Sequence, residues 1–180
     1  MSNNIYNTSN DIPNTMSNTL ENNKNVINNK FPKIIPANKI YHIINILIKI
    51  AKNSSVNQKH SAALIKGDEI YNIGFNKYCS NAKYSTVHAE IDALMTFNKK
   101  YIKGIKGMDI IIIRINNFKS NDNNINLKIS RPCNNCIDTL RKFDIRKVYY
   151  SDQYGNIVCE QLIDMQKNHT SSGQKFKLQT

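Results

Sequence analysis

The sequence predicts an α/β domain built in three layers, an α/β/α fold with helices on both faces of one mixed sheet. Segments with a helical spacing of apolar residues alternate with short apolar runs that are typical of strands. The first two of these runs flank a tight turn, and the last two are joined by a short polar turn with no room for a helix. The sequence therefore predicts a five-stranded mixed sheet whose final strand pair is antiparallel.

The N-terminal half of the predicted domain contains one helix and one hairpin. Apolar residues recur at helical spacing from Asn38 to Lys52, which predicts the first helix. The apolar run His60–Lys66 is followed by Gly67-Asp68 and then by a second run, Glu69–Phe75. Glycine and aspartate favour the turns that join hairpin strands, so the two runs predict neighbouring antiparallel strands.

The C-terminal half alternates helices and strands. Helical spacing predicts a helix over Val87–Asn98, the Ile-rich run Met108–Ile115 predicts a strand buried on both faces, and Asn117–Lys128 predicts a polar loop. The remaining expected elements are a helix and two strands, at Asn134–Phe143, Lys147–Ser151 and Ile157–Leu162. Strands connected through a helix are expected to pair in parallel.

The composition divides the chain into three parts. Residues 1–36 are rich in asparagine and poor in apolar residues, which predicts a disordered N-terminal arm. Residues 37–165 carry the elements above and form the expected catalytic domain. Residues 166–180 predict a polar C-terminal tail.

The charge and the apolar segments of the chain limit its possible partners and its cellular location. A formal net charge of +12 and an isoelectric point near 9.6 are compatible with a nucleic acid, a phosphorylated small molecule or no specific anionic partner. The start of the chain lacks the apolar core of a signal peptide, and the most apolar stretch, Ile43–Ile50, is too short to span a bilayer. We therefore expect a soluble cytoplasmic protein in a reducing compartment, with no membrane partner.

Two short motifs carry the predicted chemistry. His88-Ala89-Glu90 opens one predicted helix, and Pro132-Cys133-Asn134-Asn135-Cys136 opens another. One imidazole and two thiolates are the ligand set of a catalytic zinc site that leaves its fourth position to water. Thiolates are stabilised at a helix N-terminus. The spacing therefore predicts a Zn²⁺ ion held by His88, Cys133 and Cys136.

Glu90 is the predicted catalytic residue, because it lies too close to His88 to act as a further ligand and can move protons as a general base and then as a general acid. Three other interpretations compete, and one of them is a chance match of both motifs. The Cys-x-x-Cys pair could be a redox pair, although this leaves the histidine motif unexplained. A closed structural zinc site could instead recruit Cys79 or Cys159 as its fourth ligand.

With these motifs, the chain resembles the cytidine and deoxycytidylate deaminase superfamily over about residues 38–163. Gly74-Phe75-Asn76 is similar to the segment that ends the second strand in many members, and Ser130-Arg131 precedes the second zinc motif. The resemblance implies a cytidine-deaminase-like fold and a Zn²⁺ cofactor. It also implies substrate contacts at Asn76, Ala89, Ser130 and Arg131. The planar guanidinium of Arg131 would suit a phosphate.

The resemblance leaves the substrate open between two branches. Histidine as the first zinc ligand is similar to the deoxycytidylate, tRNA adenosine and polynucleotide enzymes, whereas an antiparallel final strand pair resembles the free-nucleoside branch. We expect hydrolytic deamination of cytosine in a small nucleoside or nucleotide, by a protein that could form a homo-oligomer. The alternatives are a deaminase of single-stranded nucleic acid or tRNA and a non-catalytic zinc-stabilised binding module.

Overall fold

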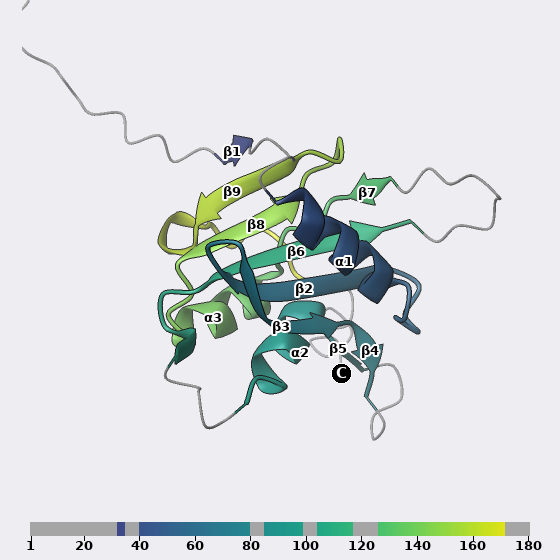
Figure 1. Ribbon diagram of the computed structural model, residues 1–180, viewed down its shortest axis with the longest axis horizontal. Coiled ribbons are helices and arrows are strands. Elements are labelled where there is room, and N and C mark those ends of the chain that lie inside the picture. The colour runs from purple at the N-terminus through teal and green to yellow at the C-terminus, as the bar shows by residue number, and fades with distance from the viewer. Residues whose placement is uncertain (1–31, 35–39, 80–84, 99–103, 117–125, 172–180) are drawn as a thin grey trace, which may run out of the picture.

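The protein has three layers around one mixed sheet. The computed structural model describes residues 32–34, 40–79, 85–98, 104–116 and 126–171. Helix α1 (Tyr41–Ala51) covers one face of the sheet, and helices α2 (Ala89–Met95) and α3 (Asn134–Lys142) cover the other (Figure 1). The predicted α/β/α fold class is therefore confirmed.

Five longer strands form the body of the sheet in the spatial order β9-β8-β6-β2-β3. Strand β2 pairs antiparallel with both β3 and β6, β6 pairs in parallel with β8, and β8 pairs antiparallel with β9. The hairpin, the parallel pair connected through α3 and the antiparallel final pair all agree with the sequence. The bounds of these strands are β2 (Lys59–Lys66), β3 (Glu69–Phe75), β6 (Asp109–Ile115), β8 (Lys147–Ser151) and β9 (Ile157–Gln161).

The predicted strand number was too low. Two-residue strands β1 (Lys33–Ile34) and β7 (Leu127–Lys128) pair with β9 and β6, so the sheet has seven strands, and β4 (Lys77–Tyr78) and β5 (Thr86–Val87) form a separate pair. Strands of two residues are too short to show a readable alternation of apolar residues. The predicted loop through Lys128 thus ends in a strand, and its residues 117–125 lie outside the described part of the chain.

The second predicted helix is shorter than expected. His88 has extended backbone angles, φ −76° and ψ 154°, so the helix begins only at Ala89, and Val87 belongs to β5. At the other end, Thr96 caps the helix, and its hydroxyl donates a hydrogen bond of 2.7 Å to the carbonyl oxygen of Asp92. The last strand also stops early, because a short 3-10 helix, η3 (Leu162–Asp164), follows Gln161.

The two predicted tails fall largely outside the described residues. Within the expected arm, β1 pairs with β9, while residues 1–31 and 35–36 are not described. Within the expected C-terminal tail, residues 166–171 are described and lie against the start of α3, and residues 172–180 are not. Described residues thus lie on both sides of the two expected boundaries, and the arm and the tail stay predictions.

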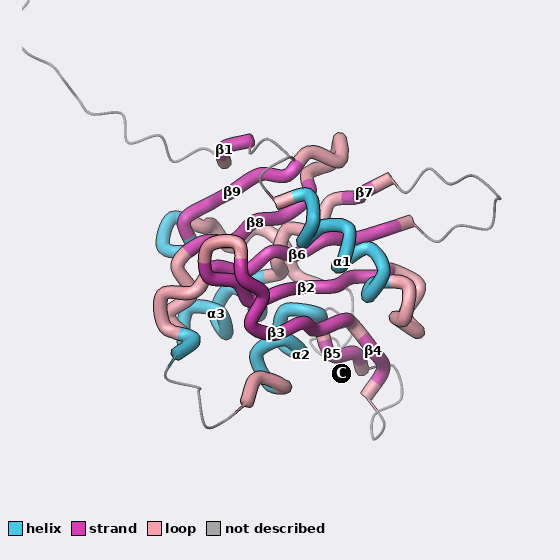
Figure 2. Tube along the Cα trace, viewed as in Figure 1, coloured by secondary structure: helices cyan, strands magenta, loops and turns pink. Residues whose placement is uncertain are grey.

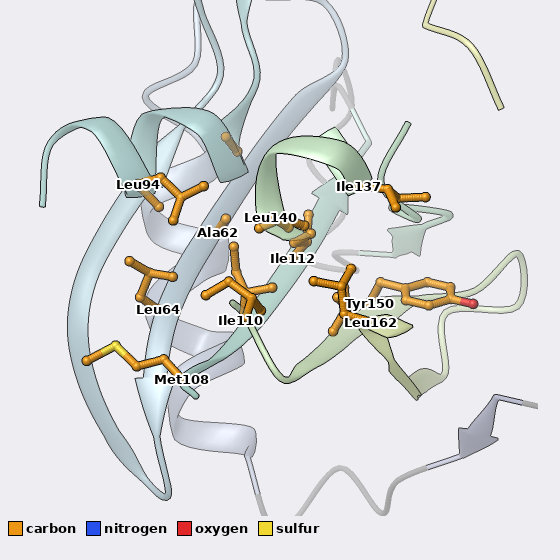
Figure 3. Packing of buried hydrophobic residues seen from close by; sticks show 14 of the residues in the cluster. Ala62, Leu64, Leu94, Met108, Ile110, Ile112, Ile137, Leu140, Tyr150 and Leu162 are labelled. Atoms are coloured by element: carbon orange, nitrogen blue, oxygen red, sulfur yellow. The ribbon is translucent and has the colours of Figure 1, made fainter. Parts of the chain in front are cut away.

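The core lies on both faces of β6. Ile110 and Ile112 pack beneath α2 and α3, together with Leu94 and Leu140, as Figure 3 shows. The alternate residues of the same strand face α1 on the other side. Figure 2 shows the sheet strands running between these helical layers. The Ile-rich run is buried on both faces, as the sequence predicted.

Gly74 is the point of closest approach between β3 and α2. A Cβ atom at this position would lie 2.3 Å from the backbone nitrogen of Ala93 and 2.5 Å from the carbonyl oxygen of Ala89. Both atoms belong to helix backbone, so relief of the clash would move α2, which carries His88 and Glu90 at its start. Glycine here therefore sets how closely the site helix packs on the sheet.

We expect Gly74→Ala to destabilise the protein by about 3 kcal/mol or more, because overpacking against backbone cannot relax through a side-chain rotation. Denaturant unfolding at neutral pH measures this loss. Gly104→Ala is the matched control, since a Cβ there meets no atom within 4 Å, and its effect is expected within about 0.5 kcal/mol. Near-wild-type stability of Gly74→Ala would contradict the described packing.

Candidate active site

Three potential metal ligands converge from two helix starts. The Nδ1 atom of His88 lies 3.2 Å from the Sγ atom of Cys136 and 3.6 Å from that of Cys133, and the two sulfur atoms are 3.5 Å apart. Among the described residues, these three form the one group of histidine, cysteine or acidic side chains close enough to hold a metal ion. The structure thus brings together residues that are 45 to 48 positions apart in the sequence.

The cluster has the dimensions of a tetrahedral zinc site. Zinc binds thiolate sulfur at about 2.3 Å and imidazole nitrogen at about 2.0 Å, which places neighbouring ligand atoms roughly 3.5 to 3.8 Å apart. The observed separations of 3.2, 3.5 and 3.6 Å lie close to this range. Three ligands leave one position for water or substrate, as in catalytic zinc sites. The donor atoms therefore fit zinc in both chemistry and spacing.

The starts of α2 and α3 position the three ligands, and contacts there shift the pKa values of the two thiols. His88 is the residue before α2 and Cys133 the residue before α3, and Cys136 lies in the first turn of α3. The hydrogen bond with Cys136 lowers the pKa of the Cys133 thiol to about 3. The same contact, together with burial, raises the pKa of the Cys136 thiol. A bound cation stabilises both thiolates, because metal ligands must be deprotonated.

Glu90 lies beside this cluster in a buried position. Its side chain is only 4% exposed, and its carboxyl group contacts the Cys136 thiol. Burial raises the pKa of the Glu90 carboxyl, while the charge of His88 opposes the shift. A carboxyl group with a raised pKa next to an open metal position can both accept and return a proton near neutral pH.

The closed structural zinc site finds little support in the geometry. Neither Cys79 nor Cys159 belongs to the metal-binding cluster, although both lie in the described part of the chain. Cys159 instead contacts Tyr149 on the outer pair of strands. A closed site with four protein ligands would need one of these two thiols. The observed geometry is that of a site with three ligands.

The Asn76 side chain joins the end of β3 to the start of β2 through hydrogen bonds. Its Oδ1 atom accepts a hydrogen bond of 2.8 Å from the backbone N–H of His60, and its Nδ2 atom donates one of 2.6 Å to the carbonyl oxygen of Gln58. The backbone carbonyl oxygen of Asn76 accepts a 2.7 Å hydrogen bond from the Ser54 hydroxyl. These bonds fix the start of β2, so the predicted sugar contact would have to share a side chain that already holds the sheet together.

Ser130 and Ala89 are both buried. The Ser130 hydroxyl donates to the carbonyl oxygen of Ile112 at 2.8 Å and accepts a hydrogen bond from the backbone N–H of Ser151, also at 2.8 Å. Ala89 is fully buried in the first turn of α2, where backbone N–H groups have no acceptor within the helix. Ser130 thus anchors the chain before Cys133, and Ala89 lies between His88 and Glu90 at the start of α2.

Arg131 is engaged by other parts of the protein. Its guanidinium group donates to both carboxylate oxygens of Glu160, at 3.4 and 3.5 Å, and to Asn168 and the carbonyl of Gln166, both at 2.9 Å. Four of its five N–H donors are thereby used. The predicted phosphate contact therefore competes with a buried ion pair. Arg131 links β9 to the C-terminal segment.

The sequence did not reveal two groups of residues that position the site. Asp92, in α2, accepts a hydrogen bond from the backbone N–H of Phe75 and forms a 2.7 Å ion pair with Lys77, which ties the helix to the end of β3. His169 in the C-terminal segment exchanges two backbone-linked hydrogen bonds with Asn134, of 2.8 and 3.1 Å. Only the spacing of Asp92 two residues after Glu90 could have signalled the first contact.

Comparison with known proteins agrees with this geometry. The model of the cytidine and deoxycytidylate deaminase zinc-binding region matches residues 38–152. No curated protein matches the chain in sequence. Among solved structures, a cytidine deaminase from Burkholderia pseudomallei aligns with a TM-score of 0.50 at 15% identity, covering 72% of this chain and 98% of that chain.

Two further structures are similar at lower scores. The dCMP deaminase of cyanophage S-TIM5, in complex with dCMP and dUMP, has a TM-score of 0.46 at 19% identity and covers 68% of this chain and 86% of that one. A diaminohydroxyphosphoribosylaminopyrimidine deaminase/reductase from Thermotoga maritima has a TM-score of 0.44 at 18% identity, covering 64% and 30%.

The fold and the cluster together define a zinc-type deaminase domain. The chain belongs to the cytidine and deoxycytidylate deaminase family, and its cofactor is zinc. No helix in the described part of the chain has the length and apolar character needed to cross a membrane.

Proposed function

We propose that this protein deaminates cytosine to uracil in a small nucleoside or nucleotide, with His88, Cys133 and Cys136 as zinc ligands and Glu90 as the catalytic residue. The observation that carries the proposal is the convergence of one imidazole and two thiolates beside a buried carboxyl group. A structural zinc site needs no proton-transfer group, whereas hydrolytic deamination does.

The reaction consumes water and releases ammonia. Zinc, when bound, supplies a Lewis acid that activates water at neutral pH. Glu90 takes a proton from the water that attacks the ring carbon bearing the amino group and delivers it to the ring nitrogen. It then moves the remaining proton of the added hydroxyl group to the departing amine, which leaves as ammonia. The raised pKa of Glu90 suits this double role. The sulfur ligands at the start of α3 remain fixed throughout.

Two features bear on the size of the substrate. The antiparallel β8–β9 pair supports the small substrate, because this strand arrangement is similar to that of the superfamily branch that acts on free nucleosides. The net charge of +12 favours the alternative, a polynucleotide. Basic surfaces bind nucleic acid without sequence preference, so the charge bears on affinity and not on which base enters the site.

The deciding experiment compares ammonia release by the zinc-loaded protein from deoxycytidine, dCMP, adenosine and a cytosine-containing single-stranded oligonucleotide. Turnover of deoxycytidine or dCMP is the expected result. Turnover of the oligonucleotide alone, at moderate salt, would replace this proposal with the polynucleotide alternative. Absence of turnover on every substrate, with zinc bound, would favour a non-catalytic module.

A further inference from the structure

A row of basic side chains crosses three strands on the face that carries the site. The register pairs His60 of β2 with Arg114 of β6, and Arg114 with Lys128 of β7. Directly opposed residues in antiparallel strands point to the same face of the sheet. We call His60, Arg114 and Lys128 the basic row.

The basic row faces the layer of α2 and α3. Residues alternate between the two faces of a strand. Ala62 and Ile112, two positions from His60 and Arg114, belong to the core beneath α2 and α3. Leu127 packs into the core beneath α1, so the next residue, Lys128, points to the opposite face. All three members of the row therefore project toward the layer that contains the metal-binding cluster.

Measured along β2 and β6, the basic row also lies close to the starts of α2 and α3. Gly74, which is opposite Ala62 in the sheet, approaches the carbonyl of Ala89 at the beginning of α2. Ser130, shortly before Cys133, is bonded to Ile112. The basic row is two residues further along β2 and β6, a step of roughly 7 Å. The basic row therefore lies one such step from the points where the sheet meets the starts of α2 and α3.

Arg114 is not paired within the described part of the chain. Its Nε atom is buried and has no hydrogen-bond partner among the described residues. Two acidic groups on neighbouring elements have other basic partners: Asp92 pairs with Lys77, and Glu160 pairs with Arg131. Like charges directly opposite each other, as at Arg114 and Lys128, are destabilising unless an anion lies between them.

Resting on the function proposed above, we propose that Arg114 and Lys128 bind the 5′-phosphate of a cytosine nucleotide and make this site selective for nucleoside monophosphates. His60, whose pKa burial lowers to about 4, is neutral at pH 7 and adds no further repulsion to the row. A guanidinium group offers several donors in one plane, which suits phosphate oxygens. The role expected of Arg131 from the sequence thus passes to Arg114.

The test measures kcat/KM for dCMP and for deoxycytidine in the zinc-loaded protein and in Arg114→Gln. We expect the ratio of the two values, dCMP over deoxycytidine, to fall by about 10- to 100-fold in the variant, as charge-assisted hydrogen bonds are lost. Arg114→Lys should restore part of this ratio. Lys66→Gln, which removes a charge at the far, exposed end of β2, is the matched control and should leave both values unchanged.

Several outcomes overturn the inference. An equal loss on both substrates would show that Arg114 supports the fold instead of a phosphate. Wild-type protein that prefers deoxycytidine would leave the deaminase proposal standing and refute the phosphate subsite. A selective effect of Arg114→Gln on an oligonucleotide, without one on dCMP, would assign the row to a phosphodiester.

Binding gives a readout that does not require turnover. Calorimetry of the products dUMP and deoxyuridine should show tighter binding of dUMP to wild type and a difference reduced by about 10- to 100-fold in Arg114→Gln. Equal affinity of wild type for the two products would contradict the subsite. A protein that deaminates neither small substrate but binds dUMP through Arg114 would refute the proposed function and retain the anion site.

Discussion

Glu90→Gln is expected to lower kcat for deamination by about 10²- to 10⁴-fold while the zinc content stays unchanged. Glutamine has nearly the same shape as glutamate but cannot accept a proton from water or return it to the departing amine. The side chain is buried, so an uncharged amide also avoids the cost of burying a carboxylate. Ammonia release and elemental analysis of the same preparation measure both quantities.

The stability of the metal-free protein shows whether Glu90→Gln affects folding as well as catalysis. The pKa of Glu90 is raised in the folded state, so at pH 7 its ionisation disfavours folding, and Glu90→Gln should be at least as stable as wild type. Glu69→Gln, at the exposed hairpin turn, is a matched control with unchanged turnover. Loss of zinc from Glu90→Gln would identify Glu90 as a ligand and contradict its catalytic role.

Cys133→Ser is expected to reduce bound zinc from about one ion per chain to nearly none. The serine hydroxyl is not deprotonated at neutral pH and is a poor substitute for a thiolate ligand. A metal that binds only the folded state at a thousand times its Kd stabilises that state by about 4 kcal/mol, so a chelator should lower the melting temperature of wild type but not of this variant.

Cys159→Ser provides the matched control for the ligand assignment. It makes the same chemical change at a cysteine outside the cluster, so its zinc content should equal that of wild type. Full zinc retention by Cys133→Ser would overturn the ligand set. Zinc loss from Cys159→Ser would instead indicate a closed site with a fourth protein ligand.

Local patterns explain what the sequence could predict. The strands on either side of Gly67-Asp68 were located to within one residue, because long apolar runs and a specific turn signal coincide there. The three potential metal ligands were predicted because each half of the set lies in a short motif. Their convergence in space required only that both motifs open helices on the same face of the sheet.

The features that the sequence could not predict depend on contacts between polar residues that lie far apart in the chain. Whether Arg131 is free to bind phosphate depends on Glu160 and Asn168, which lie 29 and 37 positions away and show no periodicity. Arg114 was hidden in an Ile-rich run that suggested only core packing. The pairing of Lys128 with Arg114 requires a strand of two residues, too short to be recognised from alternation.

The contact between the chain end and α3 has a thermodynamic consequence. His169 is bonded to Asn134, the residue after Cys133, and Lys167 forms an ion pair with Asp138 one turn further along. A bound metal would restrict Cys133 and so would reduce the entropy that the neighbouring contacts must overcome. Linkage is reciprocal, so any factor by which the docked segment raises the affinity for metal is the factor by which metal favours docking. Exchange of the His169 amide hydrogen with solvent accordingly reports the occupancy of a site to which His169 contributes no ligand.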